Sequence, residues 1–420
     1  MFGMRMNALF RALLVTAGLL VVVAGAGYAA EGDAPENAVD INDDLALVVD
    51  GEPFFPYGFC GVTEPELKEI AAMGCNTAWT FRARAVPPLR PFKDIKDVEQ
   101  QLAYMDAAEE AGLKVIAYWE NFNKRDRFIS HGYHTAAHAK KDPQRYGHYA
   151  HRTVPYMNKL FEDHLQSFKE ALPRIKEHPA LMAYSSLDEP GRTAELRELD
   201  RPLCKKVYDA VQAEDPYHPV MMLFGHWVKW TDNDDYDIVA IDAYWKVDKD
   251  RDSAFILDRF GKLFDTAEEI GKPGIAVLYY GIEKLPPQAQ RCQTYLTLIL
   301  GAKGILYFTY DFKNPESEMP QMIRQLASEI KVLGPIMLTP EVEPIVAAPD
   351  AKDIHMTERV HEGKRYLICA NASTEPVQVQ FQARGDAEIA RMTELFEERA
   401  LDEGLTDTFE GHGSHVYIVE

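Results

Sequence analysis

The stretch Leu181-Met182-Ala183-Tyr184-Ser185-Ser186-Leu187-Asp188-Glu189-Pro190 is a short apolar run with an abrupt acidic end. An apolar run of this length predicts a buried strand over 181–187. Two carboxylates and a proline follow at the position where the strand ends. Because buried carboxylates are costly unless they are hydrogen-bonded or functional, this strand end is a candidate site.

The alternation of short apolar runs with longer amphipathic runs continues on both sides of this stretch. Helix punctuation lies between the runs, since Thr63-Glu64-Pro65-Glu66 opens a helix and Gly74 closes it. An apolar stripe with helical spacing over 159–176 predicts a helix packed on a sheet. Strands are predicted at about 54–60, 76–81, 114–119, 181–187, 220–224, 238–243, 274–280 and 304–310. Eight strands that alternate with helices predict a (β/α)8 TIM barrel.

The two ends of the chain have residue patterns that differ from this alternation of strands and helices. Arg5 and Arg11 precede an apolar run over 12–26 and then small residues, which predicts a signal peptide over 1–30 and a secreted or periplasmic protein. An uncleaved N-terminal membrane anchor is the alternative. From about Val342, short strand runs joined by turn residues predict an antiparallel β-sandwich domain over 341–420. The barrel then fills 31–340.

Composition narrows the class of protein and of partner. The chain has 420 residues, of which 46% are hydrophobic and 26% charged, as in ordinary globular proteins. The net charge of −21 and the absence of a basic stripe argue against a nucleic-acid partner. The five cysteines are widely spaced, with no CxxC pair, so we expect buried thiols in preference to a bridge between Cys60 and Cys75.

Aromatic and acidic residues gather where the predicted strands end, which is the face on which a (β/α)8 barrel builds its active site. All five tryptophans lie at such positions. Aromatic rings stack on the flat apolar faces of sugars, although these rings would also serve to plug the barrel mouth. We expect substrate contacts from Trp79, Trp119, Glu120, Asp188, His226, Trp227, Tyr244, Trp245, Tyr280 and Tyr310.

The stretch over 181–190 resembles the fourth-strand signature of clan A glycoside hydrolases, which usually reads Asn-Glu-Pro. The segments Val48-Val49-Asp50-Gly51-Glu52-Pro53-Phe54 and Gly301-Ala302-Lys303-Gly304-Ile305-Leu306-Tyr307-Phe308 are also typical of such barrels, so the resemblance covers about 45–338. It implies hydrolysis of glycosidic bonds in an oligo- or polysaccharide, with Glu189 as general acid/base and Asp188 in place of a substrate-binding asparagine. We expect no cofactor.

The predicted seventh strand departs from this resemblance. It ends in Leu278-Tyr279-Tyr280-Gly281, where the clan places a nucleophilic glutamate. Hydrolysis needs a second carboxylate. Asp242 and Asp311 leave strands that flank the seventh and are the expected partners, with Glu120 and Glu283 as further candidates.

Two other interpretations stay open. The missing glutamate favours a catalytically inactive barrel that binds glycans through its strand-end aromatics. Glu189 would then have a structural role, for example in a salt bridge to Arg82.

A histidine-rich segment follows the predicted third strand and contains His131, His134, His138, His148 and His151. Histidines at this density are typical of metal sites, but their spacing is loose and no H-E-x-x-H pattern is present. We therefore expect no metal and assign the segment to sugar contacts or to a solvated loop.

Overall fold

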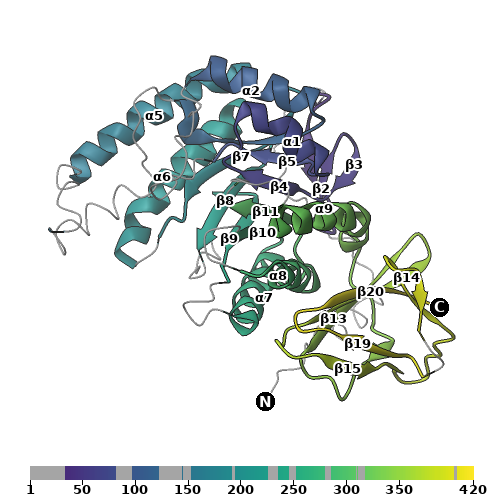
Figure 1. The fold of residues 1–420 in the computed structure, drawn as a ribbon. Helices are drawn as coiled ribbons and strands as arrows, with labels where there is room; N and C mark the ends of the chain where they lie inside the picture. The colour runs from purple at the N-terminus through teal and green to yellow at the C-terminus, as the bar shows by residue number, and fades with distance from the viewer. Residues whose placement is uncertain are drawn as a thin grey trace, which may run out of the picture. The chain divides into compact units, whose positions relative to one another are not determined.

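Eight parallel strands close a barrel in the computed structural model, in the order β10-β11-β4-β5-β6-β7-β8-β9 (Figure 1). The structure describes residues 34–81, 97–122, 144, 153–191, 194–225, 235–245, 252–279, 285–308, 310, 317–401 and 404–420. The barrel strands are β4 (Tyr57–Cys60), β5 (Thr77–Trp79), β6 (Lys114–Tyr118), β7 (Leu181–Asp188), β8 (Val220–Gly225), β9 (Ile238–Asp242), β10 (Gly274–Tyr279) and β11 (Gly304–Phe308). The predicted TIM barrel is confirmed.

Helices cover the outside of the barrel, as the amphipathic runs predict. They are α1 (Leu67–Ala72), α2 (Val98–Glu110), α5 (Val154–Ile175), α6 (Ala194–Glu214), α7 (Ser253–Glu269), α8 (Pro287–Ile299) and α9 (Glu318–Met337), with 3₁₀ turns η1 (Glu64–Glu66) and η2 (Trp119–Phe122). At the start of η1, both the amide and the hydroxyl of Thr63 donate to Glu66 Oε2, at 2.8 and 2.6 Å. The whole predicted apolar stripe of α5 is buried.

An antiparallel hairpin precedes the barrel, and it corrects one predicted strand. Strands β1 (Val39–Ile41), β2 (Leu47–Val49) and β3 (Glu52–Phe54) form a small sheet. Asp50 and Gly51 turn the chain between β2 and β3 with positive φ angles of 53° and 82°, as a tight hairpin requires. The predicted strand over 54–60 is present as β4 but begins later than expected, because β3 ends at Phe54 and β4 begins after Pro56, which has no N–H to donate.

The C-terminal region is a β-sandwich domain, which confirms the predicted fold class. Its main sheet has the antiparallel order β13-β14-β20-β17-β18, and the pairs β15-β19 and β12-β16 supply further antiparallel sheets. The strands are β12 (Val346–Ala347), β13 (Ile354–His361), β14 (Lys364–Asn371), β15 (Val377–Gln380), β16 (Gln382–Ala383), β17 (Met392–Glu394), β18 (Arg399–Ala400), β19 (Thr406–Phe409) and β20 (Ser414–Val419).

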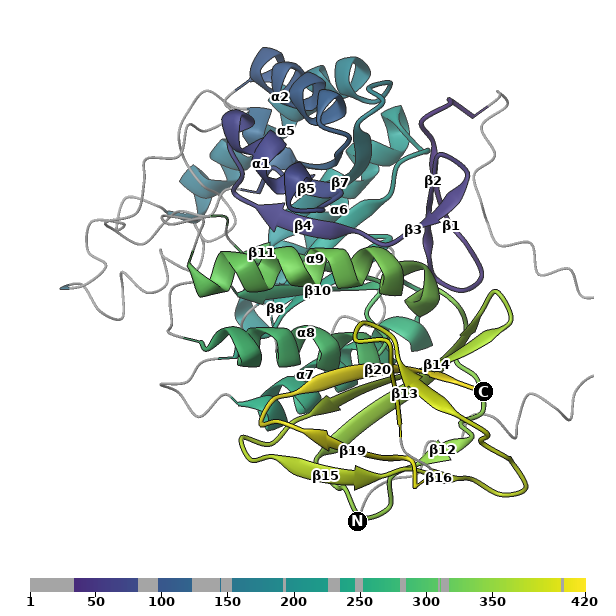
Figure 2. The ribbon, with the colours of Figure 1, turned by 45° about the vertical axis from the view of Figure 1, so that its right-hand side comes forward.

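Strand β14 is buried on both faces because it lies between two cores. Leu367 and Cys369 belong to the core inside the sandwich, whereas Ile368 and Ala370 belong to the core shared with the barrel helices. This division follows from the two-residue period of a strand. Helix α8 lies against β13, β14 and β20, as Figure 2 shows. On α8, Arg291 Nη1 donates to the Ser414 carbonyl at 2.7 Å and Nη2 pairs with Glu329 Oε1 at 3.1 Å, so buried polar contacts also tie the domain to the barrel.

Other sequence features have simple structural outcomes. All five cysteines are buried and free, as expected. The sequence Asn371-Ala372-Ser373 matches a glycosylation sequon, but in the folded chain Asn371 is buried and its Nδ2 donates to the carbonyls of Glu375 and Glu410. Within the described ranges, no helix combines the length and the apolarity that a membrane span needs.

Candidate functional site

The end of β7, the fourth barrel strand, carries a bulge just before its two carboxylates. Ser185 pairs with Met221 of β8 and Asp188 pairs with Leu223, so β7 contains one residue more than its neighbour over the same length. Bulges re-aim side chains and are over-represented near active sites. Glu189 follows with a φ of 42°, in the left-handed region, and its amide donates to the Leu223 carbonyl at 3.0 Å. Backbone strain therefore falls on the glutamate that the sequence predicts as general acid/base.

Asp242, the last residue of β9, and Tyr244, two residues later, lie two strands further round the barrel. The carboxylate of Asp242 is buried and accepts a hydrogen bond from the Tyr244 hydroxyl. Burial raises the pKa of the Tyr244 phenol well above its usual value, and the negative charges of Asp242 and Asp188 raise it further. The phenol is therefore a neutral hydrogen-bond donor at physiological pH, within electrostatic reach of both strand ends.

Three aromatic rings pack together at the ends of β9, β10 and β11. The ring of Tyr244 lies 5.1 Å from that of Tyr279 and 6.0 Å from that of Phe308, while Tyr279 and Phe308 are 5.9 Å apart. All three rings are partly exposed. We call these three residues the aromatic triangle. It offers the kind of ring surface on which a sugar stacks.

Further aromatic rings, which are buried, pack next to the triangle in the direction of β5 and β6. Phe81 lies 6.3 Å from Phe308, 5.1 Å from Tyr118 and 4.7 Å from Trp79, which it stacks on. Trp79 is only 1% exposed, so its ring packs against Phe81 and presents no exposed face to a ligand.

Two further tryptophans pack against neighbouring elements. Trp119 is fully buried, and its ring lies 5.2 Å from that of Phe161 and 6.3 Å from that of His164, both on α5. Trp245 is 6% exposed and meets His412 of the C-terminal domain edge-on at 5.1 Å. Neither ring faces the aromatic triangle in any contact that the described residues make, so the roles of Trp79, Trp119 and Trp245 in substrate binding stay predictions.

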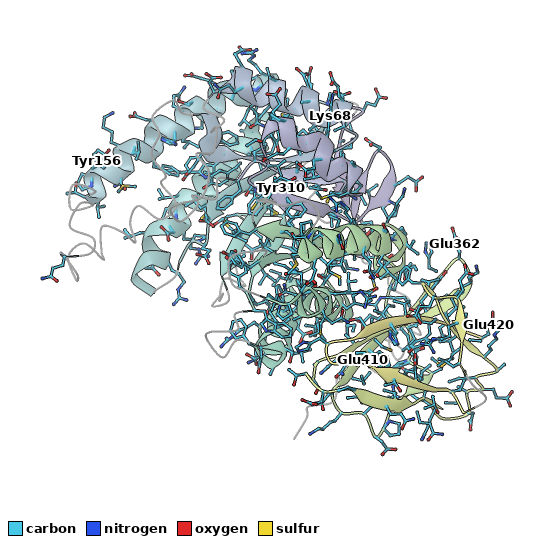
Figure 3. All side chains as sticks on the ribbon, in the orientation of Figure 1. Lys68, Tyr156, Tyr310, Glu362, Glu410 and Glu420 are labelled. Atoms are coloured by element: carbon cyan, nitrogen blue, oxygen red, sulfur yellow. The ribbon has the colours of Figure 1, made fainter. Side chains whose placement is uncertain are left out.

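Two other predicted site residues are buried near the barrel mouth. Glu120 lies in η2, directly after β6, and is 3% exposed. Tyr310, labelled in Figure 3, is 4% exposed and packs edge-on against Phe59 of β4. Its amide donates to the Cys60 carbonyl, which fixes the chain just after β11 at the end of β4.

Several predicted residues lie outside the described residues. These are His226, Trp227, Tyr280 and Asp311 of the expected site, the further candidates Glu283, Trp230 and Arg82, and His131, His134, His138, His148 and His151. Among the residues that are described, no group of three or more His, Cys, Asp or Glu side chains is arranged to hold a metal ion.

Three features of this site were not predicted from the sequence. Tyr279 is a member of the aromatic triangle, whereas the sequence predicted substrate contacts from the neighbouring Tyr280. Both residues lie at the end of the predicted seventh strand, so their position could have indicated either of them. Phe308 ends β11 and carried the same signal. The left-handed backbone of Glu189 had no sequence signal, because it follows from the bulge in β7.

Known proteins resemble this chain in structure but not in sequence. No family model matches the chain, and no curated protein matches its sequence. A beta-galactosidase from Bacillus circulans sp. alkalophilus has a TM-score of 0.59 over 87% of this chain and 99% of that chain, at 10% identity. A beta-galactosidase from G. stearothermophilus, solved as a catalytic mutant, has a TM-score of 0.57 over 87% and 98%, also at 10% identity.

An alpha-amylase extends the range of similar structures. The enzyme from Geobacillus thermoleovorans, solved with acarbose, has a TM-score of 0.51 over 91% of this chain and 94% of that chain, at 12% identity. At such low identity these likenesses establish the fold and leave the chemistry to the site. The chain has a (β/α)8 barrel fold like that of these glycoside hydrolases, with a C-terminal β-sandwich domain.

Proposed function

We propose that this protein is an exported glycoside hydrolase that cleaves glycosidic bonds in an oligo- or polysaccharide, with Glu189 as general acid/base. The observation that carries the proposal is the strained, left-handed Glu189 that follows the bulge of β7 beside Asp188. Such strain persists where the surrounding structure imposes it, and it clusters at active sites. A carboxylic acid at the mouth of the barrel is suited to protonate the departing glycosidic oxygen.

Asp242 is our choice for the second carboxylate. It ends β9, and β8 separates it from the strand that bears Glu189. Adjacent strands are about 4.8 Å apart, so the two backbones are separated by roughly 10 Å before their side chains lean toward each other. That spacing suits a pair about 6.5–9.5 Å apart, in which one carboxylate activates water and the product is inverted. Asp311 is the other residue proposed for this role.

The aromatic triangle supplies a surface for the sugar ring. Tyr244, Tyr279 and Phe308 are partly exposed at three adjacent strand ends, beside the carboxylates. The similar beta-galactosidases and the acarbose-bound alpha-amylase support a saccharide as the substrate class. The acidity of the chain, at −21, also favours a neutral ligand over a polyanion.

One observation favours a second candidate function, glycan binding without hydrolysis. Strand β10 ends in Tyr279, whose ring packs into the aromatic triangle. The clan A glycoside hydrolases that this chain resembles carry a nucleophilic glutamate at this strand end. A barrel of this kind would keep the sugar surface and lack the reaction.

The test is sugar release from a broad panel of plant, algal and microbial glycans by the wild type and by Glu189→Gln. We expect release by the wild type and a loss of at least about 100-fold in the variant, since a positioned acid/base contributes 10²–10⁴. Glu269→Gln, an exposed change on α7, is the matched control. Equal release by Glu189→Gln and wild type would refute the role of Glu189. Binding of a glycan by both, measured by calorimetry, with release by neither would establish the second function.

Two further measurements address the finer parts of the proposal. The anomeric form of the first product, followed by NMR, is expected to be inverted; retention would require a carboxylate about 5–5.5 Å from Glu189 and would exclude Asp242 at the proposed spacing. Export is tested by the intact mass of the protein recovered outside the cytoplasm, which should lack the first 29 or 30 residues.

A further inference from the structure

The segment that leaves β9 has two faces, and they contact different domains. Asp242 and Tyr244 are hydrogen-bonded to each other at the barrel mouth. Trp245 packs instead on the C-terminal domain, where the edge of its ring meets that of His412 at 5.1 Å and 89°. Trp245 is 6% exposed and belongs to the hydrophobic core of the barrel, so its contact with His412 is one part of the packing that buries it. The segment that carries these site residues therefore also contacts a different domain.

His412 sits in a turn whose backbone is fixed by several contacts. Its amide donates to the Ser373 carbonyl at 2.8 Å, and its φ of 60° is left-handed. A Cβ on the preceding Gly411 would lie 2.0 Å from the Thr374 carbonyl oxygen, so this position has no room for a side chain. The side chain of Asn371 donates to the Glu410 carbonyl at 3.0 Å and so joins this turn to the 371–374 turn. The pair of turns therefore presents His412 in one orientation.

The same pair of turns also holds the helices that follow β9 and β10. Ser253, the first residue of α7, donates from its hydroxyl to the Ala372 carbonyl at 2.6 Å. On α8, Cys292 Sγ donates to the Asn371 carbonyl at 3.3 Å and Gln288 Nε2 approaches the His412 carbonyl at 3.4 Å. Both the end of β9 and the start of α7 thus contact the C-terminal domain.

We propose that His412 is a positioning residue for the barrel site: through Trp245 it fixes the end of β9, and with it Asp242 and Tyr244. The C-terminal domain is then part of the scaffold of the site as well as a cover for the flank of the barrel. This inference rests on the proposed function for its effect on turnover, but the mechanical coupling between His412 and β9 is measurable without any substrate.

The test compares His412→Asn with Glu362→Asn. Asparagine tolerates the left-handed backbone, so the first change removes the ring contact without adding strain. Glu362 also has a left-handed backbone, with φ 48°, and lies in the β13–β14 turn, apart from the turn that contains Glu410 (Figure 3). It is therefore a matched control. Hydrogen exchange followed by mass spectrometry on the full chain reads out the peptides that cover β9 and the start of α7.

We expect His412→Asn to speed exchange in those two peptides by roughly two- to tenfold, which corresponds to the loss of one aromatic pair, and to leave the β5 and β6 peptides unchanged. Glu362→Asn should not speed exchange in either peptide. On the glycoside that the wild type hydrolyses fastest, kcat of His412→Asn should fall by roughly tenfold while KM stays within about twofold, because a misplaced reacting group costs rate more than binding. Unchanged exchange at β9, or faster exchange throughout the chain, would overturn the proposal.

Trp245 provides a second, independent measurement. Trp245→Phe keeps an aromatic ring against His412 and should exchange like the wild type, whereas Trp245→Leu should reproduce the effect of His412→Asn. The double variant should show no more than the single effect, since both changes remove one contact; additive effects would contradict the coupling. If the wild type hydrolyses no glycan, the exchange pattern still decides this inference, and only the proposed function fails.

Discussion

The hydroxyl of Tyr244 hydrogen-bonds the carboxylate of Asp242, two residues earlier in the chain. The negative charge of Asp188, at the end of β7, also raises the pKa of this phenol. The phenol is therefore bonded to the proposed base and lies within electrostatic range of the strand end that carries the proposed acid. A neutral donor in this position stabilises a carboxylate in its ionised form, which is the form that a water-activating base requires.

Tyr244→Phe should lower kcat by roughly 10- to 100-fold, the equivalent of one hydrogen bond to a charged group. Because that hydrogen bond favours the ionised carboxylate, its loss should also move the acidic limb of the pH-rate profile to higher pH. The measurement is kcat against pH on the fastest glycoside found. Tyr366→Phe, in β14 of the C-terminal domain, is the control and should leave both quantities unchanged. An unshifted acidic limb in Tyr244→Phe would argue against Asp242 as the base.

Glu189→Asn should stabilise the protein while it abolishes hydrolysis. The left-handed backbone costs most residues about 1–2 kcal/mol, and asparagine adopts it more readily. We expect the free energy of unfolding in urea to rise by up to about 1 kcal/mol. Glu362→Asn relieves a similar φ outside the site and should give a similar gain with full activity. A loss of stability in Glu189→Asn alone would mean that the Glu189 side chain stabilises the fold.

The strands of the barrel were predictable because their signal is local. Each buried strand is a short apolar run, and punctuation such as Gly74, with φ 97°, stands between the strands in the sequence itself. The predicted strands over 76–81 and 304–310 ran past the ends of β5 and β11. The predicted strand over 54–60 began too early, because two apolar segments follow each other there without a polar residue between them and only Pro56 marks the break.

The direction of strand-end side chains was not predictable in the same way. Trp119 and Tyr244 both follow barrel strands, yet Trp119 packs outward on α5 and Tyr244 lies in the aromatic triangle. Position along the chain gives the end of a strand but not the side on which a residue emerges, which depends on local turns and bulges. The contact between Trp245 and His412 joins residues 167 positions apart in two domains, and no pattern within either segment indicates the other.

A buried network at the opposite end of the barrel should be important for stability alone. Asp215 accepts from the Tyr184 hydroxyl at 2.7 Å and lies 2.8 Å from His218 Nδ1, while His218 Nε2 contacts the Asn37 carbonyl at 2.9 Å. Asp215→Asn breaks the centre of this network and should lower the free energy of unfolding by about 1.5–3 kcal/mol, the contribution of a hydrogen bond to a charged group. Urea unfolding measures the change.

Two comparisons make the effect of Asp215 specific. Tyr184→Phe removes one hydrogen bond and should cost about 1–2 kcal/mol. Asp209→Asn breaks an exposed pair with Lys205 on α6 and should cost less than about 0.5 kcal/mol. Hydrolysis by Tyr184→Phe should match the wild type, because these residues lie before β8 and at the start of the β7 pairing, away from the carboxyl ends of the strands.

Asp407 should make the stability of the C-terminal domain depend on acid pH. Burial opposes its ionisation, but hydrogen bonds from His415, Arg399 and Tyr417 hold the pKa of Asp407 well below its usual range. The pKa of the unfolded chain is about 4, so the folded state binds fewer protons. The stabilisation is therefore complete above about pH 4 and is lost as the pH falls further.

Asp407→Asn should lower the free energy of unfolding by about 1–3 kcal/mol at pH 7, and the difference from wild type should shrink at pH 3. Asp386→Asn, in an exposed turn of the same domain, is the control and should change the free energy of unfolding by less than about 0.5 kcal/mol. A difference for Asp407→Asn that is equal at pH 7 and pH 3 would mean that the polar contacts matter and the charge does not.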